Sequence, residues 1–357
     1  MFGPSRSAYP EPRTGERCVR PARAVEGKPL AATANSASNT IRLSSTDVAL
    51  IVLLGLIWGS AFPAIRFGLL AGASPIAFGV ARFAGATAVM VPIALLRRTD
   101  APDRTTILYS AVLGGVLLIG LYAAFLYIGE EVISAGLASV LVGCSPIWSA
   151  LFGIALLPSD RLSRRAWAGL LLGFVGVIVL FLPDLLHGAG GSTWGAVAVL
   201  LAAVVAALGS VLLRRMMHAP PNAWSLSVEF SMAALLLGVL SVSIPGQAAL
   251  PLRWEVWVSL AYLVAIPSIA GYTIYFRLLH TVGPSRSNLV TYVAPLAGIG
   301  IGVLLLGEAP SATELFGFVL IVLGLLFVQR EPARPTGDSG PLPAGTSPAS
   351  TGSAVSK

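Results

Sequence analysis

Long runs of apolar residues, each about twenty residues in length, occupy most of the sequence between residues 47 and 329. A helix needs about 20 apolar residues to cross the hydrocarbon core of a bilayer, whereas a helix of a soluble domain carries only one apolar stripe. Only 11% of the residues are charged, against about a quarter in soluble domains. The chain is therefore expected to be an all-α integral membrane protein, which excludes most classes of soluble enzyme.

Pro, Gly and charged residues divide this apolar region into stretches that accommodate about ten spans with short loops. Transmembrane helices are expected near residues 47–71, 75–96, 105–128, 132–157, 164–183, 192–213, 222–244, 254–280, 284–306 and 311–329.

The two ends of the chain differ from this region. Residues 1–45 are rich in Pro, Arg, Ser, Ala and Glu, and residues 331–357 are rich in Pro, Gly, Ser and Thr. Neither segment contains an apolar stretch that would offset the loss of chain entropy on folding, so both are expected to be disordered tails. The first tail also lacks the apolar core of a secretory signal peptide, so the first span is expected to act as its own insertion signal.

Basic residues gather in alternate loops, whereas the remaining loops are mainly acidic. The basic set comprises Arg97, Arg98, Arg104, Arg161, Arg164, Arg165, Arg214, Arg215 and Arg286. The opposite set comprises Glu130, Glu131, Asp184, His187, Glu255, Glu308 and Glu314, with Arg253 as its clear basic residue. Cytoplasmic loops retain Lys and Arg during insertion, so the basic side and both termini are expected to be cytoplasmic. This predicts a multi-pass protein of the cell membrane with an even number of spans, in a setting that suits a bacterial inner membrane.

The chain resembles itself weakly at a spacing of about 149 residues. Gly59-Ser60 in the first span corresponds to Gly209-Ser210 in the sixth, and Pro146 in the fourth span corresponds to Pro295 in the ninth. The spacing predicts two five-helix units.

These units are expected at residues 46–183 and 184–330. Because five is an odd number, the second unit must cross the membrane in the opposite sense. The loop charges agree, since residues 160–165 are basic whereas the corresponding residues 308–314 include no basic side chain. This is the arrangement of inverted-repeat transporters, in which a site near the midplane is exposed to each side in turn.

Several motifs occur in the order typical of one family. They are Ile-Trp-Gly-Ser-Ala-Phe-Pro-Ala-Ile-Arg at 57–66, Ser-Ala-Gly-Leu-Ala-Ser-Val-Leu at 134–141 leading to Ser145-Pro146, and Leu-Leu-Leu-Gly-Glu at 304–308. Together with the repeat, they resemble the EamA-type transporters of the drug/metabolite transporter superfamily over nearly all of residues 47–329. The loop at 157–163 departs from the family's usual Leu-Gly-Glu-Arg-Leu-Ser, which affects the local turn and not the fold.

The resemblance implies a ten-helix secondary transporter of small metabolites, often an exporter of amino acids or related solutes, that works by alternating access around a central cavity. An antiporter or uniporter for a nucleoside, a sugar derivative or a cationic drug is the alternative within transport. An integral-membrane lipid-modifying enzyme or a membrane assembly partner without transport activity is the alternative outside it. An enzyme of that kind would gather several His, Asp or Glu residues at an interface, whereas His187, His218 and His280 are dispersed.

Glu229 and Arg82 lie farther from the ends of their expected spans than Arg66 and Arg277 do, at depths where a charge is costly and must face a cavity or a partner. Glu229, in the seventh span, would couple proton movement to transport or hold an amine; the alternative is a hydrated or packing role. Arg82, in the second span, would receive a substrate carboxylate through its two-pronged guanidinium; the alternative is a structural residue that reaches outward to the interface. Outward reach is also the interpretation for Arg66 and Arg277.

Aromatic and small polar residues at helical spacing form candidate cavity walls. They are Ser145 and Trp148 on the fourth span, Ser268, Tyr272 and Tyr275 on the eighth, and Asn288 and Tyr292 before Pro295 on the ninth. Trp and Tyr would suit apolar, aromatic or amine-bearing solutes, although a helix-packing role is the alternative for each position.

Motifs for other chemistry are missing from the sequence. No Walker sequence, spaced His/Glu metal ligands or Gly-x-Ser-x-Gly elbow occurs, so transport energy is expected to come from gradients. No metal, cofactor or nucleic-acid partner is expected, and the predicted partners are a small solute, the lipid bilayer and, through Glu229, the proton. The sequence makes no prediction of oligomeric state.

Overall fold

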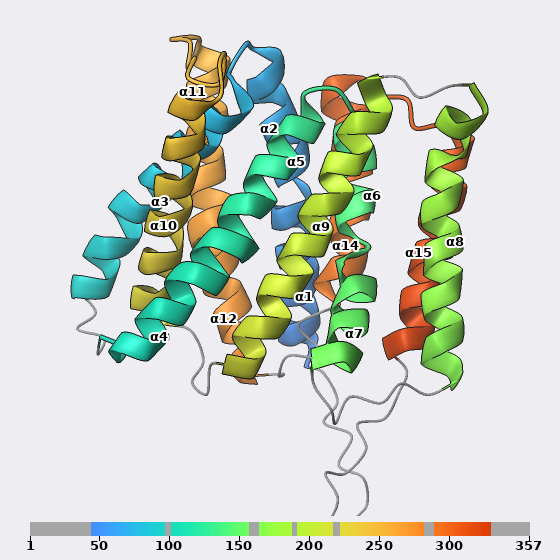
Figure 1. Cartoon of the computed structure of the whole chain (residues 1–357), viewed down its shortest axis with the longest axis horizontal. Coiled ribbons are helices and arrows are strands. Elements are labelled where there is room, and N and C mark those ends of the chain that lie inside the picture. The colour runs from blue at the N-terminus through green and yellow to red at the C-terminus, as the bar shows by residue number, and fades with distance from the viewer. Residues whose placement is uncertain are drawn as a thin grey trace, which may run out of the picture. The chain divides into compact units, whose positions relative to one another are not determined.

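The computed structural model describes residues 44–96, 101–156, 164–187, 191–216, 222–281 and 289–329, and every regular element in these ranges is a helix (Figure 1). Seven helical stretches of the described chain are long and apolar enough to cross a membrane: Ser45–Leu70, Pro75–Leu96, Arg104–Glu130, Ala135–Leu156, Ser192–Met216, Ala223–Ser243 and Trp254–Tyr275. Three shorter apolar helices cover Trp167–Leu180, Val290–Leu306 and Ala312–Gly324. The expectation of an all-α membrane class is confirmed at this level.

The helices of the first half follow the expected spans closely. They are α1 (Ser45–Gly59), α2 (Ala61–Leu70), α3 (Pro75–Leu96), α4 (Arg104–Tyr109), the π-helix η1 (Ser110–Leu121), α5 (Tyr122–Glu130), α6 (Ala135–Val142), α7 (Ser145–Leu156) and α8 (Arg164–His187). Helix α8 extends four residues beyond the expected unit boundary at residue 183.

The helices of the second half begin with α9. They are α9 (Gly191–Met216), α10 (Ala223–Ser243), α11 (Trp254–Leu263), the π-helix η2 (Val264–Ala270), α12 (Gly271–Thr281), α14 (Val290–Leu306) and α15 (Ala312–Gln329).

Polar residues define several helix starts. Ser44 and Asp47 form a reciprocal capping box at α1, which satisfies backbone donors that have no partner within the helix. Asp103 caps α4 by accepting from the Thr105 amide at 3.2 Å and from the Thr106 hydroxyl. The hydrogen bond from the Thr106 side chain is the main cause that lowers the pKa of the Asp103 carboxyl. These caps place the first turns of both spans at a polar boundary.

Proline and glycine interrupt the spans at defined points. Pro146 is the second residue of α7 and lacks an amide hydrogen, so the fourth span divides into α6 and α7 around Gly143 and Cys144. The eighth span contains Pro267 within η2, where the bonding pattern widens to that of a π-helix. The third span has a π-helical segment of its own, η1, without a proline. Such π segments often mark functional sites.

Helices far apart in sequence pack in pairs. Helix α3 packs on α10, α1 on α14, α9 on η1 and α5, and α8 on α15, which lie side by side in Figure 1. Phe78, Tyr127 and Phe230 are among the largest fully buried side chains of the core. The core therefore lies between elements of the two halves of the sequence.

Candidate functional site

Arg82 of α3 is directed into the protein and not toward a membrane surface. Its Nη1 donates to the Tyr127 hydroxyl of α5 at 2.7 Å, and its Nε donates to the Ser268 hydroxyl of η2 at 3.2 Å. Tyr127 and Ser268 are both fully or almost fully buried. These contacts contradict the interpretation that Arg82 reaches outward to the interface, because its guanidinium joins three spans.

Aromatic side chains surround this guanidinium. Tyr122 and Tyr272 lie within electrostatic range of Arg82. The Tyr272 ring packs at 5.5 Å from Phe230 of α10 and at 5.7 Å from Trp58 of α1, measured between ring centroids. Helices α1, α3, α5, α10, η2 and α12 thus contribute to one group of residues, called the Arg82 cluster here: Trp58, Arg82, Tyr122, Tyr127, Phe230, Ser268 and Tyr272.

Tyr275 packs against Trp58, a member of the Arg82 cluster. Its ring centroid lies 5.2 Å from that of Trp58, whose indole Nε1 donates to the Pro267 carbonyl at 3.3 Å. Three of the sequence-predicted residues of the eighth span, Ser268, Tyr272 and Tyr275, are therefore near Arg82 or one ring away. This agrees with their helical spacing.

Glu229 of α10 is buried, with 4% of its surface exposed, and its Oε1 has no hydrogen-bond partner in the described structure. The carboxyl group packs against the backbone of η1, where a Cβ added to Gly114 would lie 2.6 Å from the Glu229 carboxyl carbon. Tyr272 lies within its electrostatic range, which connects Glu229 to the Arg82 cluster. The burial contradicts the interpretation of a hydrated interfacial Glu229.

The other sequence-predicted residues are not in contact with Arg82 in the described structure. The Ser145 hydroxyl donates to the Val142 carbonyl of its own span at 2.6 Å, and the Trp148 ring packs on Phe174 of α8 at 5.2 Å. The Tyr292 hydroxyl is buried and has no partner among the described residues. Asn288 lies outside the described residues.

Sequence reasoning missed Tyr122, Tyr127 and Trp58. Trp58 belongs to the motif at 57–66, and Tyr127 lies three residues before Glu130 on one helix face. Neither the motif nor the spacing indicates which span the side chain contacts. Arg66 donates its Nη1 to the main-chain carbonyls of Glu130 at 2.5 Å and Glu131 at 2.7 Å, at the end of α5.

A second acidic group lies at the same end of α5. Glu308 accepts from the backbone amides of Ala135 at 2.7 Å and Gly136 at 3.1 Å, the first two residues of α6. The turn that directs Glu308 there ends α14 at Gly307, whose φ of +67° is in the left-handed region that favours glycine. Glu308 therefore joins the ends of the fourth and ninth spans.

We expect Glu308→Ala to lower the free energy of unfolding by about 1–3 kcal/mol, because the Ala135 and Gly136 amides would lose their acceptor in a part-buried position. Thermal unfolding of the purified full chain in detergent measures the change. Glu255→Ala is the matched control, since the ion-pair partner of Glu255 in the described part of the chain is the exposed Arg253 and little change is expected. Equal shifts for both variants would contradict a specific role for Glu308.

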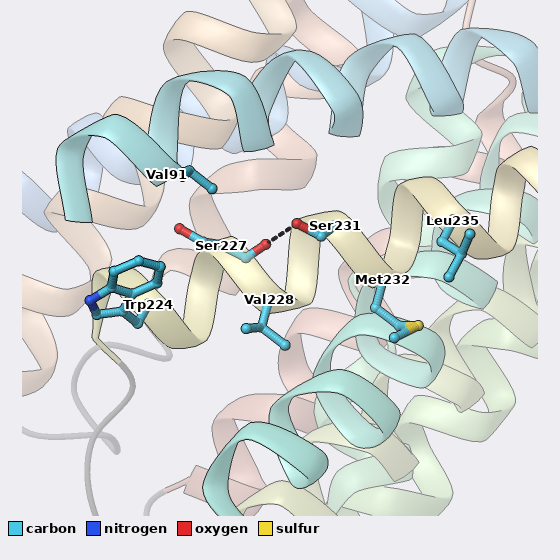
Figure 2. A pocket seen from close by; sticks show the side chains of 7 residues that line it. All are labelled: Val91, Trp224, Ser227, Val228, Ser231, Met232 and Leu235. Carbon is cyan, nitrogen blue, oxygen red and sulfur yellow. Dashed lines mark hydrogen bonds between the residues drawn. The ribbon is translucent and has the colours of Figure 1, made fainter. Parts of the chain in front are cut away.

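A pocket of about 290 Å³ lies along α10 beside α3 (Figure 2). Its lining residues are Val91, Trp224, Ser227, Val228, Ser231, Met232 and Leu235. Within it the Ser231 hydroxyl donates to the Ser227 carbonyl at 2.7 Å, so this polar group is already satisfied along the helix. None of the sequence-predicted site residues lines this pocket.

Relatives of known name resemble the chain over most of its length. YedA of Escherichia coli K12, named as an uncharacterized inner membrane transporter, is 28% identical over 77% of this chain and 88% of its own. The "Probable amino-acid metabolite efflux pump" of Salmonella typhimurium LT2 is 30% identical over 79% of this chain and 94% of its own. A solved crystal structure shares the fold, with a TM-score of 0.55 and 22% identity over 80% of this chain and 97% of its own.

The model of the EamA-like transporter family matches the chain twice, at residues 46–182 and 193–330. These two matches cover the described helices, including those that carry Arg82 and Glu229. The chain therefore belongs to the EamA-like transporter family, whose members are membrane transporters and not, by name, enzymes.

Proposed function

We propose that this protein is a secondary active transporter that exports amino acids or related small solutes by alternating access. The observation that carries the proposal is the inward-directed Arg82, held by Tyr127 and Ser268 at the meeting of three spans. No ion pair to Arg82 is found among the described residues, so the anion that balances its charge would come from a substrate carboxylate. The Salmonella relative's name supports amino acids as the solute class.

The transport mechanism rests on ten spans arranged as two inverted five-helix repeats, at residues 46–183 and 184–330. Two observations support ten spans. The family model matches the chain twice, and the described chain contains seven long and three shorter apolar helices. The π-helices η1 and η2 support the repeat, because they occur in the third and the eighth spans at about the 149-residue spacing. A rocking motion of one repeat against the other would expose the Arg82 cluster to each side in turn.

The contact of Glu308 with α6 supports the orientation. It places the start of the fourth span and the end of the ninth on one side, where the loops are acidic. The basic loops and both termini would then be cytoplasmic.

Within this mechanism, Arg82 would hold the carboxylate of the solute and the Trp58, Phe230 and Tyr272 rings would contact its side chain. Ser145, Trp148, Asn288 and Tyr292 remain proposed cavity positions of the fourth and ninth spans. Glu229 would bind the coupling proton, since its buried Oε1 has no partner in the described structure.

Counterflow in proteoliposomes tests this function. Purified full-length protein is reconstituted, loaded with one unlabelled solute, and assayed with labelled amino acids, amines and nucleosides. Uptake confined to solutes that carry a carboxylate is the expected result. Uptake of amines or nucleosides alone would favour a different solute class, and well-folded protein without flux of any solute would contradict the proposed function.

We expect Glu229→Gln to abolish accumulation driven by a pH gradient while counterflow persists, because Gln cannot release a proton yet fits the space against Gly114. Accumulation and counterflow are measured on the same vesicles with and without the gradient. Glu255→Gln, at the exposed Arg253 pair, is the control and keeps both activities. Gradient-driven accumulation by Glu229→Gln equal to that of the unaltered protein would show that Glu229 serves packing only.

A further inference from the structure

Glu130 is the most deeply buried acidic residue of the described structure. It ends α5, its exposed fraction is 0%, and neither carboxylate oxygen has a hydrogen-bond partner among the described residues. The next residue, Glu131, is exposed. By sequence Glu130 belongs to an acidic loop, whereas in the structure it is the last residue of helix α5 and its side chain is buried.

The groups that face Glu130 do not neutralise it by direct contact. Arg66 of α2 acts on it electrostatically but donates its Nη1 to main-chain carbonyls. Glu308, after α14, also acts on it and repels a second negative charge. Arg82 of α3 acts from farther along the span, where its own hydrogen bonds go to Tyr127 and Ser268.

The other elements packed against this end add no charge in the described structure. Helix α6 carries no titratable side chain, and η1 carries none. The charged residues of α9, Arg214 and Arg215, lie at its opposite end, whereas its Gly195 and Val199 contact Gly129 beside Glu130. Tyr127, one turn earlier on α5, has its hydroxyl bound to Arg82.

An ionised carboxylate with neither a hydrogen bond nor a contact ion pair is costly to bury, whereas the protonated acid carries no net charge. A bound metal cation would need several oxygen ligands. The only other carboxylate among the charged groups that act on Glu130 belongs to Glu308, and its oxygens already accept from the Ala135 and Gly136 amides. A proton needs one oxygen only, so it is the ligand that this site fits best.

The role of Glu130 follows from its position relative to Glu229. Glu229 packs against Gly114 in η1, and Glu130 ends the same span, Arg104–Glu130. Glu130 lies sixteen positions after Gly114 in the chain. Tyr122 and Tyr127 occupy the stretch between them; Arg82 donates to the Tyr127 hydroxyl and lies within electrostatic range of Tyr122. This span therefore ends in one buried, unpartnered acid, Glu130, and contacts a second, Glu229 of α10, at Gly114.

We propose that Glu130 is a second proton-binding site of the carrier, reached from the side of the membrane opposite to that of Glu229. A carboxylate oxygen of Glu130 takes one proton from water when this end opens and keeps it while Arg66, Glu308 and α9 close around it. The proton returns to water when the same end reopens. This inference rests on the proposed transport function for its role, but the protonation itself is measurable without transport.

Infrared difference spectra of the purified full chain, titrated over pH, test the protonation. The expected result is a carboxylic-acid carbonyl band that Glu130→Gln removes and Glu131→Gln retains, because Glu131 is the exposed neighbour of the same type. Glu229→Gln removes a separate component. Spectra of Glu130→Gln identical to those of the unaltered protein at every pH would overturn the proposal.

Gln matches a protonated acid in charge and size, so the variant is expected to fold, which its thermal unfolding verifies. If it does not fold, Glu130→Asp provides the second test, since it shifts the pH midpoint of the band without removing it. An unchanged midpoint in Glu130→Asp would overturn the proposal.

Transport provides a separate measurement. We expect Glu130→Gln to lose the dependence of flux on the pH of the side opposite the basic loops, while Glu131→Gln keeps it. A full pH dependence in Glu130→Gln would overturn the coupling role. If the unaltered protein carried no solute, the proposed transport function would fail, yet the infrared titration would still decide whether Glu130 binds a proton.

Discussion

Transport of carboxylate-bearing solutes by Arg82→Gln is expected to fall by about 10- to 100-fold, because hydrogen bonds to a charged group contribute about 1.5–3 kcal/mol. Arg82 is half-buried and presents a planar guanidinium that already meets Tyr127 and Ser268. A carboxylate that approaches the remaining N–H groups of Arg82 would be attracted by the positive charge and would accept hydrogen bonds from the planar guanidinium. Initial rates of labelled amino-acid counterflow measure the loss.

Two further variants separate charge from geometry at this position. Arg82→Lys keeps the positive charge but lacks the two-pronged donor, so an intermediate rate is expected. Arg277→Gln removes an Arg from an exposed position on α12 and is expected to leave the rate unchanged. An equal loss for amines that lack a carboxylate would assign Arg82 to the stability of the span junction and not to solute binding.

We expect Gly59→Ala to lower the free energy of unfolding by about 1–3 kcal/mol through overpacking. A methyl group at Gly59 would overlap the Ala294 carbonyl oxygen and lie 2.5 Å from the Ala297 Cβ on α14. The neighbour is backbone, which cannot turn aside as a flexible side chain can. The same substitution would separate α1 from α14, which belong to the two proposed repeats, so transport is expected to fall as well.

Gly300→Ala is the matched control for this change. Gly300 lies on α14, the helix that Gly59 of α1 packs against, but no heavy atom lies within 4 Å of a Cβ added there. Alanine favours a helix over glycine by about 0.5–1 kcal/mol, so this variant is expected to be as stable as the unaltered chain or more so. Thermal unfolding in one detergent compares the two variants. A larger loss for Gly300→Ala than for Gly59→Ala would contradict the packing of α1 on α14.

The span positions were predictable because the bilayer imposes one strong condition on every segment. The expected helix at 75–96 coincides with α3, and that at 254–280 differs from α11–α12 by one residue at its end. Periodicity also placed Ser268, Tyr272 and Tyr275 on one face. The π segments were not predictable, since η1 has no proline and its apolar residues fit an ordinary helix equally well.

The contacts between residues of different spans could not be predicted in the same way. Ser145 and Trp148 have the same spacing signal as the eighth-span residues, yet Trp148 packs on α8 and not near Arg82. Helical periodicity identifies a face but carries no information about which neighbour that face will meet.

The sequence by itself determined that this chain is helical, that it enters a membrane, and which family it resembles, because apolar length and motif order are local properties. Only the tertiary structure decided that Arg82 turns inward to Tyr127 and Ser268, and that Glu130 is buried one residue before the exposed Glu131. The reason is physical: the cost of burying a charge depends on partners that come from spans far away in sequence, so it arises only when those spans pack.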